Sequence, residues 1–293
     1  MSDKIIMTLS DFKKSDKSNT PFYALLGYPI EHSWSPLMHN LALKYHNIEA
    51  QYVAIAVQNN ELNELAAFFN EENFLGANIT IPYKEILMDY LDSIDPSAKA
   101  IGAINTIVKN DFQLRGTNTD YKGFKAPLLD YEYELDGSSA IVFGTGGASR
   151  SIVVALRDMG LSRIYLVSRS PGSNSSSWIN RKDVELISYN NWTSFLDDTF
   201  LIVNATPLGM HPDVNQSPVR EAEKYFLQDR ICYDIVYNPL ETKFLKQAKE
   251  VGAQTINGLE MLIQQGNKSF ELWTGKSFPI DKIRKRLHER IKN

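Results

Sequence analysis

The sequence AIVFGTGGASR, residues 140–150, joins an apolar run to a turn rich in glycine, and apolar residues then recur at helical spacing until Gly160. This pattern predicts a strand, a tight turn and a helix. Gly144 and Gly146 carry no Cβ atom, so the backbone can turn sharply there and approach a ligand. The N-terminus of the helix would offer N–H groups to an anion such as a pyrophosphate. By itself the stretch fits nucleotide binding and a plain structural turn equally well.

The next predicted strand, residues 163–167, runs into Ser168-Arg169-Ser170. In an NAD-binding unit, an acidic residue at about this distance from the glycines holds the ribose hydroxyls. Here the position carries no acid, and an arginine between two hydroxyls suits a 2′-phosphate. The alternative is an ordinary solvated arginine. We therefore expect NADP rather than NAD as the cofactor.

Length and composition set the protein class. The 293 residues are too many for one comfortable core, so we expect two domains. Hydrophobic residues at 43% and charged residues at 23% are typical of an ordinary soluble globular protein. The net charge of -4 gives no electrostatic reason to expect nucleic acid or an anionic membrane as a partner.

The single cysteine, Cys232, cannot form an internal disulfide and has no second thiol for a metal site. We therefore expect no metal and a reducing, cytoplasmic compartment. No apolar run is long enough to span a bilayer, and residues 1–20 contain no hydrophobic signal core. We expect these first residues to form a mobile or loosely docked extension of unknown purpose.

The first half alternates predicted strands at 23–27, 51–57 and 76–81 with a predicted helix at 60–70. This order predicts a mainly parallel sheet, with ligands at the carboxyl ends of its strands. Before the second strand, Ser35 is a good helix N-cap ahead of Pro36. Capping leaves Ser33 unexplained, and two hydroxyls at a helix N-terminus would also receive a carboxylate.

Two charged residues, Lys84 and Asp120, are candidates for a catalytic role. Asn78, Thr80 and Lys84 fall at the carboxyl edge of the third strand, although a lone loop lysine is usually only solvated. Residues 103–108 and 112–116 are predicted to form a hairpin. Asp120 then opens a predicted helix, where it acts either as a cap or as a group at the mouth of a cleft between the domains.

The second half predicts strands at 184–188, 200–203, 232–235 and 255–256, and a helix at 242–252. Residues 171–177 are polar and rich in serine, so the helix expected there is short or missing. Helices from 259 to 273 and through 280–291 are expected to pack back on the first domain. The predicted fold is α/β, with a mixed substrate domain at 1–122 and 258–293 and a Rossmann-type NADP-binding domain at 123–257.

Taken together, these segments resemble the shikimate dehydrogenase family over nearly the whole chain from Tyr23. The matching pieces are GYPIEHSWSPLMHN at 27–40, NITIPYK at 78–84, GAINT at 102–106, NTD at 118–120, GTGGASR at 144–150, NATPLGM at 204–210, DIVYNPLET at 234–242 and NGLEMLIQQ at 257–265. The resemblance implies the reversible, NADPH-dependent reduction of 3-dehydroshikimate to shikimate in the aromatic amino-acid pathway.

The resemblance also implies a role for individual residues. Lys84 and Asp120 would meet at the reacting oxygen. The substrate-binding residues implied are Ser33 and Ser35 on the carboxylate, Tyr237 nearby, and Thr80, Asn105 and Gln265 on ring hydroxyls. The cofactor-binding residues implied are Gly144, Gly146, Gly147, Ala148, Ser168, Arg169, Ser170, Thr206 and Gly258. The implied partner is the small-molecule substrate, shikimate or 3-dehydroshikimate, with no nucleic acid and no membrane. The protein would be a monomer or a homodimer.

Two departures and two alternatives accompany this interpretation. NADP-specific family members commonly have Asn-Arg-Thr where this chain has Ser168-Arg169-Ser170, and a second arginine shortly afterwards is absent. NADP stays favoured, with a weaker hold on its phosphate. One alternative is a quinate/shikimate dehydrogenase that uses NAD. The other is a metabolite sensor without catalysis on the same fold, which would not need both Lys84 and Asp120.

Overall fold

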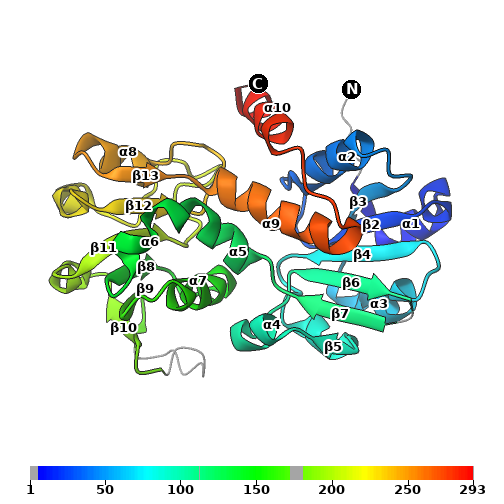
Figure 1. The fold of residues 1–293 in the computed structure, drawn as a ribbon, viewed down its shortest axis with the longest axis horizontal. Helices are drawn as coiled ribbons and strands as arrows, with labels where there is room; N and C mark the ends of the chain where they lie inside the picture. The colour runs from blue at the N-terminus through cyan, green and yellow to red at the C-terminus, as the bar shows by residue number, and fades with distance from the viewer. Residues whose placement is uncertain (1–5, 112, 172–180, 293) are drawn as a thin grey trace. The chain divides into compact units, whose positions relative to one another are not determined.

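The computed structural model describes residues 6–111, 113–171 and 181–292, and the chain divides into two compact units (Figure 1). Unit 1 comprises residues 1–119 and 265–288, and unit 2 comprises 120–264 and 289–293. These breaks lie at 119/120, 264/265 and 288/289, whereas the predicted domain boundaries lie at 122/123 and 257/258. The assignment of substrate to the first domain and of cofactor to the second stays a prediction.

Unit 1 is built on a mixed sheet of seven strands in the order β1-β3-β2-β4-β6-β7-β5. The strands are β1 (Ile6–Thr8), β2 (Phe22–Gly27), β3 (Gln51–Ala56), β4 (Phe74–Ile79), β5 (Ser93–Ile94), β6 (Thr106–Asn110) and β7 (Gln113–Thr117). The first four strands of that order are parallel, as predicted. β6 runs antiparallel to both β4 and β7, and the β6–β7 pairing confirms the predicted hairpin.

Three helices, α1 (Leu9–Lys14), α3 (Leu62–Phe69) and α4 (Pro96–Ile101), bury apolar side chains in one cluster with strands of this sheet. Unit 1 also contains α2 (Ser35–Tyr45) and those parts of α9 (Gly258–Thr274) and α10 (Ile280–Lys292) that fall within residues 265–288. The indole N–H of Trp273 in α9 donates to the carbonyl of Ile107 at 2.9 Å, and its ring stacks on Tyr23. This part of the C-terminal region therefore packs on the first domain, as predicted.

The N-terminal extension is part of the unit 1 core. β1 pairs in parallel with β3 at the edge of the sheet, and both Leu9 and Phe12 in α1 are fully buried. The ring of Phe12 meets that of Phe22 edge-on, with centroids 4.7 Å apart. The expectation of a loosely docked extension is therefore wrong for residues 6–20. The i, i+3 spacing of Leu9 and Phe12 places both side chains on one helix face. This pattern is hard to recognise in the sequence because the neighbouring residues are polar.

Unit 2 is built on six parallel strands in the order β10-β9-β8-β11-β12-β13. They are β8 (Ser139–Phe143), β9 (Arg163–Ser168), β10 (Val184–Ser188), β11 (Thr199–Asn204), β12 (Ile231–Asp234) and β13 (Gln254–Ile256), connected in part by α7 (Gly147–Asp158) and α8 (Lys243–Glu250). α5 (Asp120–Lys125) and α6 (Glu132–Leu135) precede β8. The strand order reverses beside β8, which is the ligand-binding switch point of doubly wound sheets. The predicted Rossmann-type fold is confirmed.

Both faces of the unit 2 sheet are covered. β8 alternates its side chains between two apolar clusters, with Ala140 and Val142 in one and Ile141 and Phe143 in the other. This explains why parallel strands appear in the sequence as continuous apolar runs. The predicted weak helix at 171–177 lies mostly in residues 172–180, outside the described residues. Within the described ranges, none of the helices combines the length and the apolar character that a membrane crossing requires.

Candidate active site

Two serine hydroxyls lie together at the N-terminus of α2. Ser33 Oγ accepts a hydrogen bond from the Ser35 N–H and lies 3.3 Å from Ser35 Oγ, to which it donates. Ser35 is the first residue of α2, and the capping position belongs to Trp34, which makes no side-chain capping bond. The predicted capping role of Ser35 is therefore wrong by one residue. The structure brings both hydroxyls to the positive end of a helix of 11 residues, a place that favours a carboxylate.

Thr80 directly follows β4 and is half-buried. Its N–H donates to the carbonyl of Leu26 at 2.9 Å, which continues the pairing with β2. A Cβ atom on Gly27, the last residue of β2, would collide with Cγ2 of Thr80. Gly27 therefore creates the space that the Thr80 side chain occupies.

Asn105 is held by the segment that precedes Asp120. Its Oδ1 accepts from the Thr119 N–H at 2.7 Å and from Thr106 Oγ1 at 2.9 Å, while its Nδ2 donates to Thr119 Oγ1 at 3.0 Å. Asn105 is only 2% exposed. These contacts fix the orientation of the Asn105 amide, and they fix the backbone immediately before Asp120.

A second asparagine, Asn78 on β4, joins the same buried network. Its Nδ2 donates to Ser269 Oγ at 2.9 Å and to Thr106 Oγ1 at 3.1 Å, and its Oδ1 accepts from the hydroxyl of Tyr52 at 2.8 Å. Burial raises the pKa of Tyr52 well above its usual value, against the opposing effect of a hydrogen bond with Ser35. The network therefore runs from the α2 N-terminus to α9.

Lys84 and Gln265 also belong to unit 1. Lys84 is half-buried, and its carbonyl accepts from the Ile104 N–H at 2.8 Å. Gln265 lies one turn before Ser269 on α9, and its carbonyl accepts from the Ser269 hydroxyl at 3.1 Å. Asp120 is the first residue of α5 and of unit 2. The approach of Lys84 to Asp120 stays a prediction.

Tyr237 is the predicted substrate-binding residue that unit 2 supplies. It follows β12 by three positions and is half-buried. Burial raises the pKa of its hydroxyl. The Tyr237 hydroxyl is therefore protonated at neutral pH and able to donate a hydrogen bond.

The glycine turn in unit 2 has the predicted strand-turn-helix form. Gly144 has φ +107°, and its N–H donates to Val167 O at 3.0 Å. Gly146 is the N-cap of α7 and makes no side-chain capping bond. A Cβ atom on Gly146 or Gly147 would meet no atom within 4 Å, so the helix N-terminus, with Ala148 in its first turn, has an open face. These features fit a bound pyrophosphate.

The predicted 2′-phosphate site adjoins this turn in the sheet. Ser168 ends β9, and its Oγ accepts from the Ser170 N–H at 3.2 Å. Arg169 between them is exposed. Burial raises the pKa of Tyr189, and the positive charge of Arg169 opposes this effect. An exposed guanidinium beside two hydroxyls fits a 2′-phosphate.

Thr206 and Gly258 have structural roles that are visible without a ligand. Thr206 Oγ1 donates to Asn204 Oδ1 at 2.6 Å, and its Cγ2 would lie 3.1 Å from a Cβ atom on Gly144. Gly258 begins α9, where a Cβ atom would collide with the carbonyl of Ile235. The close approach of Gly258 to the exit of β12 thus explains this glycine by itself.

Two family models match the chain. One, the shikimate dehydrogenase substrate binding domain, matches residues 25–107, and the other, the shikimate 5'-dehydrogenase C-terminal domain, matches residues 258–288. The NADP(+) shikimate dehydrogenase of Moorella thermoacetica is 38% identical over 280 residues, covering 93% of this chain and 94% of that protein. This chain belongs to the shikimate dehydrogenase family.

Solved structures of family members agree with this assignment. The Thermus thermophilus shikimate 5-dehydrogenase in complex with NADP(H) and shikimate has a TM-score of 0.79 at 32% identity, covering 90% of this chain and 97% of that one. The Listeria monocytogenes enzyme in complex with shikimate and NAD has a TM-score of 0.82 at 30% identity, covering 92% and 96%. The family recognised from the sequence motifs, and its fold, are confirmed.

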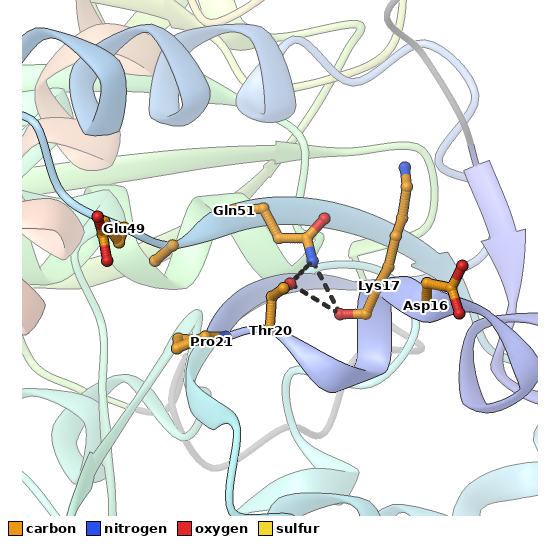
Figure 2. Close-up of a pocket in the computed structure, with 7 residues that line it drawn as sticks. Asp16, Lys17, Thr20, Pro21, Glu49 and Gln51 are labelled. Carbon is orange, nitrogen blue, oxygen red and sulfur yellow. Dashed lines mark hydrogen bonds between the residues drawn. The ribbon is translucent and has the colours of Figure 1, made fainter.

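Surface cavities occur away from the predicted site residues of this family member. One cavity of about 590 Å³ is lined by Asp16, Lys17, Thr20, Pro21, Glu49, Ala50 and Gln51 (Figure 2). In it, Gln51 Nε2 donates to Lys17 O at 2.8 Å and to Thr20 Oγ1, so these polar groups already bond one another. Across residues 6–111, 113–171 and 181–292, no three His, Cys, Asp or Glu side chains gather as a metal would require.

Several buried polar residues have structural roles that the sequence motifs do not indicate. The sequence pattern places Asn78 at a strand end but indicates no role for Thr106, Thr119 and Ser269, which complete its network. Asp234 belongs to the motif at 234–242 that resembles the family, and the structure shows that it is fully buried. Asn204 follows the predicted strand 200–203 and Asp234 lies near the end of the next one, 232–235, so their similar positions could have indicated that they pair.

Proposed function

We propose that the chain is an NADP-dependent shikimate dehydrogenase, which catalyses the reversible reduction of 3-dehydroshikimate to shikimate. The observation that carries this proposal is the 38% identity to an NADP(+) shikimate dehydrogenase over 93% of the chain. The open glycine turn at the sheet switch point and the exposed Arg169 support the cofactor. The hydroxyl and amide groups of unit 1 support the substrate.

The proposed chemistry uses Lys84 and Asp120. NADPH, when bound, supplies a hydride to the carbonyl carbon of the substrate. Negative charge then grows on the carbonyl oxygen, where the Lys84 ammonium stabilises it and donates the proton that completes the hydroxyl group. Asp120 orients Lys84 and shares in the proton transfer. The reverse reaction returns the proton to this pair.

The proposed substrate contacts are neutral apart from the catalytic pair. Ser33 and Ser35 would bind the carboxylate at the α2 N-terminus with Tyr237 nearby, while Thr80, Asn105 and Gln265 would bind ring hydroxyls. A site whose polar groups match substrate hydroxyls rejects analogues that lack them, because its own groups are then left unpaired. The buried hydrogen bonds that fix the Asn105 amide would keep this matching strict.

The two alternatives are less well supported. The relatives above are named as dehydrogenases, and the first is named for NADP(+), which favours an enzyme over a sensor. Arg169 occupies the position where NAD-binding units place an acid, which favours NADP over NAD. A cytoplasmic location and a monomeric or homodimeric state stay predictions.

The proposal is tested by following absorbance at 340 nm with shikimate or quinate and each oxidised cofactor in turn. We expect shikimate with NADP⁺ to give the highest kcat/KM. Faster turnover of quinate with NAD⁺ would replace both the substrate and the cofactor assignment. Binding of shikimate without turnover of either cofactor would favour the sensor.

A further inference from the structure

Asp234 is a fully buried carboxyl group at the end of β12. β11 and β12 are parallel, and their last residues, Asn204 and Asp234, are register partners. Paired residues of parallel strands project from the same face of a sheet. The two side chains are therefore brought together by the backbone ladder, and Asn204 Nδ2 donates to Asp234 Oδ1 at 3.1 Å.

Two further groups donate hydrogen bonds to the Asp234 carboxylate. Thr242 Oγ1 donates to Oδ2 at 2.6 Å, and the Val236 N–H donates to Oδ1 at 2.9 Å. Burial raises the pKa of Asp234 to about 6, while the hydrogen bonds from Thr242, Val236 and Asn204 lower it. The group is thus mostly ionised at pH 8, where it can only accept hydrogen bonds.

The amide of Asn204 connects the Asp234 carboxylate to the loop that follows β11. Its Nδ2 donates to Leu208 O at 3.0 Å as well as to Asp234. Its Oδ1 accepts from the N–H and the hydroxyl of Thr206 at 3.1 and 2.6 Å. An acceptor-only carboxylate forces the NH₂ group toward Asp234, which leaves the oxygen facing Thr206.

Thr206 then contacts the glycine turn. Its Oγ1 accepts from the Leu208 N–H at 3.2 Å, which closes the loop on itself. A Cβ atom on Gly144 would lie 3.1 Å from both Thr206 Cγ2 and the carbonyl oxygen of Ala205. The loop at 205–210 thus rests against the turn that is proposed to receive the pyrophosphate.

We infer that Asp234 is a positioning residue, which fixes the Asn204 amide and thereby holds the cofactor-side loop, residues 205–210, against the glycine turn. This inference rests on the proposed function, since it assumes that Thr206 and the turn bind NADP. The property of Asp234 that this role requires is its negative charge, because three donors point at the carboxylate. The residue does not itself touch the reacting atoms.

The test measures NADPH binding by fluorescence, together with steady-state kinetics at pH 8, in purified full-length variants. Asp234→Asn keeps the volume but offers an NH₂ group where donors converge. We expect Kd for NADPH and KM for NADP⁺ to rise about tenfold, with KM for shikimate changed by less than about twofold. Thr242→Val is the matched control, because it removes the donor to Oδ2 but keeps the charge of Asp234 and the Thr242 methyl group that lies beside Gly209 of the loop. It should lower stability and leave both cofactor constants unchanged.

The outcomes separate the inference from the proposed function. An Asp234→Asn protein that folds and binds NADPH normally overturns the inference while the function stands. The same holds if Thr242→Val produces an equal cofactor defect, since the effect would then be general destabilisation. Should Asp234→Asn not fold, Asn204→Ala removes the amide that connects Asp234 to the loop at 205–210. Normal NADPH binding in Asn204→Ala would also overturn the inference. Wild-type protein that binds no NADPH defeats the proposed function and this inference together.

Discussion

The rings of His39 and Tyr52 stack with centroids 4.2 Å apart and planes 5° from parallel. Among the described residues, both ring nitrogens of His39 are buried without a hydrogen-bond partner. Phe270, Trp273 and Phe278 pack around the ring, so Tyr52 is the one titratable group in this set of contacts. Burial lowers the pKa of His39 to about 3, and the folded protein therefore holds a neutral imidazole.

His39 should make unit 1 sensitive to acid. Its folded pKa of about 3 lies below the unfolded value of 6.5, so the unfolded state binds the extra proton between these limits. Stability should fall as pH drops below 6.5, by up to about 1.4 kcal/mol per pH unit. In His39→Phe this contribution is absent and the stacking is kept. Urea unfolding at pH 7.5 and pH 5 should show a smaller loss of stability in the variant, and equal losses would contradict the prediction.

Lys84→Ala should lower kcat by roughly 10² to 10⁴, because general acid-base assistance is lost, while KM for shikimate changes much less. Initial rates at saturating NADP⁺ measure both constants. Lys99→Ala is the matched control, since Lys99 is an exposed lysine on α4. Near-normal kcat in Lys84→Ala would remove this residue from the chemistry.

Arg169→Ala should raise KM for NADP⁺ by about 10- to 100-fold through loss of a charge-assisted contact to the 2′-phosphate. KM for NAD⁺ should hardly change, since that cofactor has no such phosphate. Arg163→Ala tests an exposed arginine at the opposite end of the same strand, and it should leave both constants unaltered. Equal losses with the two cofactors would show that Arg169 does not select between them.

Phe12→Ala should destabilise the protein by about 3–5 kcal/mol, the usual cost of emptying a large aromatic site in a core. The ring is fully buried against Phe22 and Phe68. Thermal or urea unfolding measures the change, with Lys14→Ala on the exposed side of α1 as control. A loss no larger than that of the control would mean that the extension contributes little to the core.

Much of the architecture followed from local patterns. The predicted apolar runs form parallel strands, and the predicted hairpin is formed by β6 and β7. These features depend mainly on neighbouring residues in the sequence. The N-terminal segment was misjudged because Leu9 and Phe12 acquire their importance from distant partners such as Phe68. Propensity and periodicity do not contain that information.

The candidate site was predictable to the extent that single residues carry its chemistry. Ser33, Asn105 and Arg169 were named from motifs, and the structure places them at a helix terminus, in a buried network and at a strand end. The supporting residues were missed because a buried Ser269 or Asp234 matters through the groups it bonds, which lie far away in the sequence. The Ser35 cap failed by one position, a typical error at helix boundaries.

The edge position of the N-terminal strand has a consequence for comparisons within the family. Because Phe12 fills a space bounded by Phe22 and Phe68, the sizes of these two rings are matched to a segment that precedes the region covered by the family model. A relative without such a segment must supply bulk from elsewhere or carry different side chains at both positions. Transplanting either phenylalanine alone into that relative would leave an aromatic face in water.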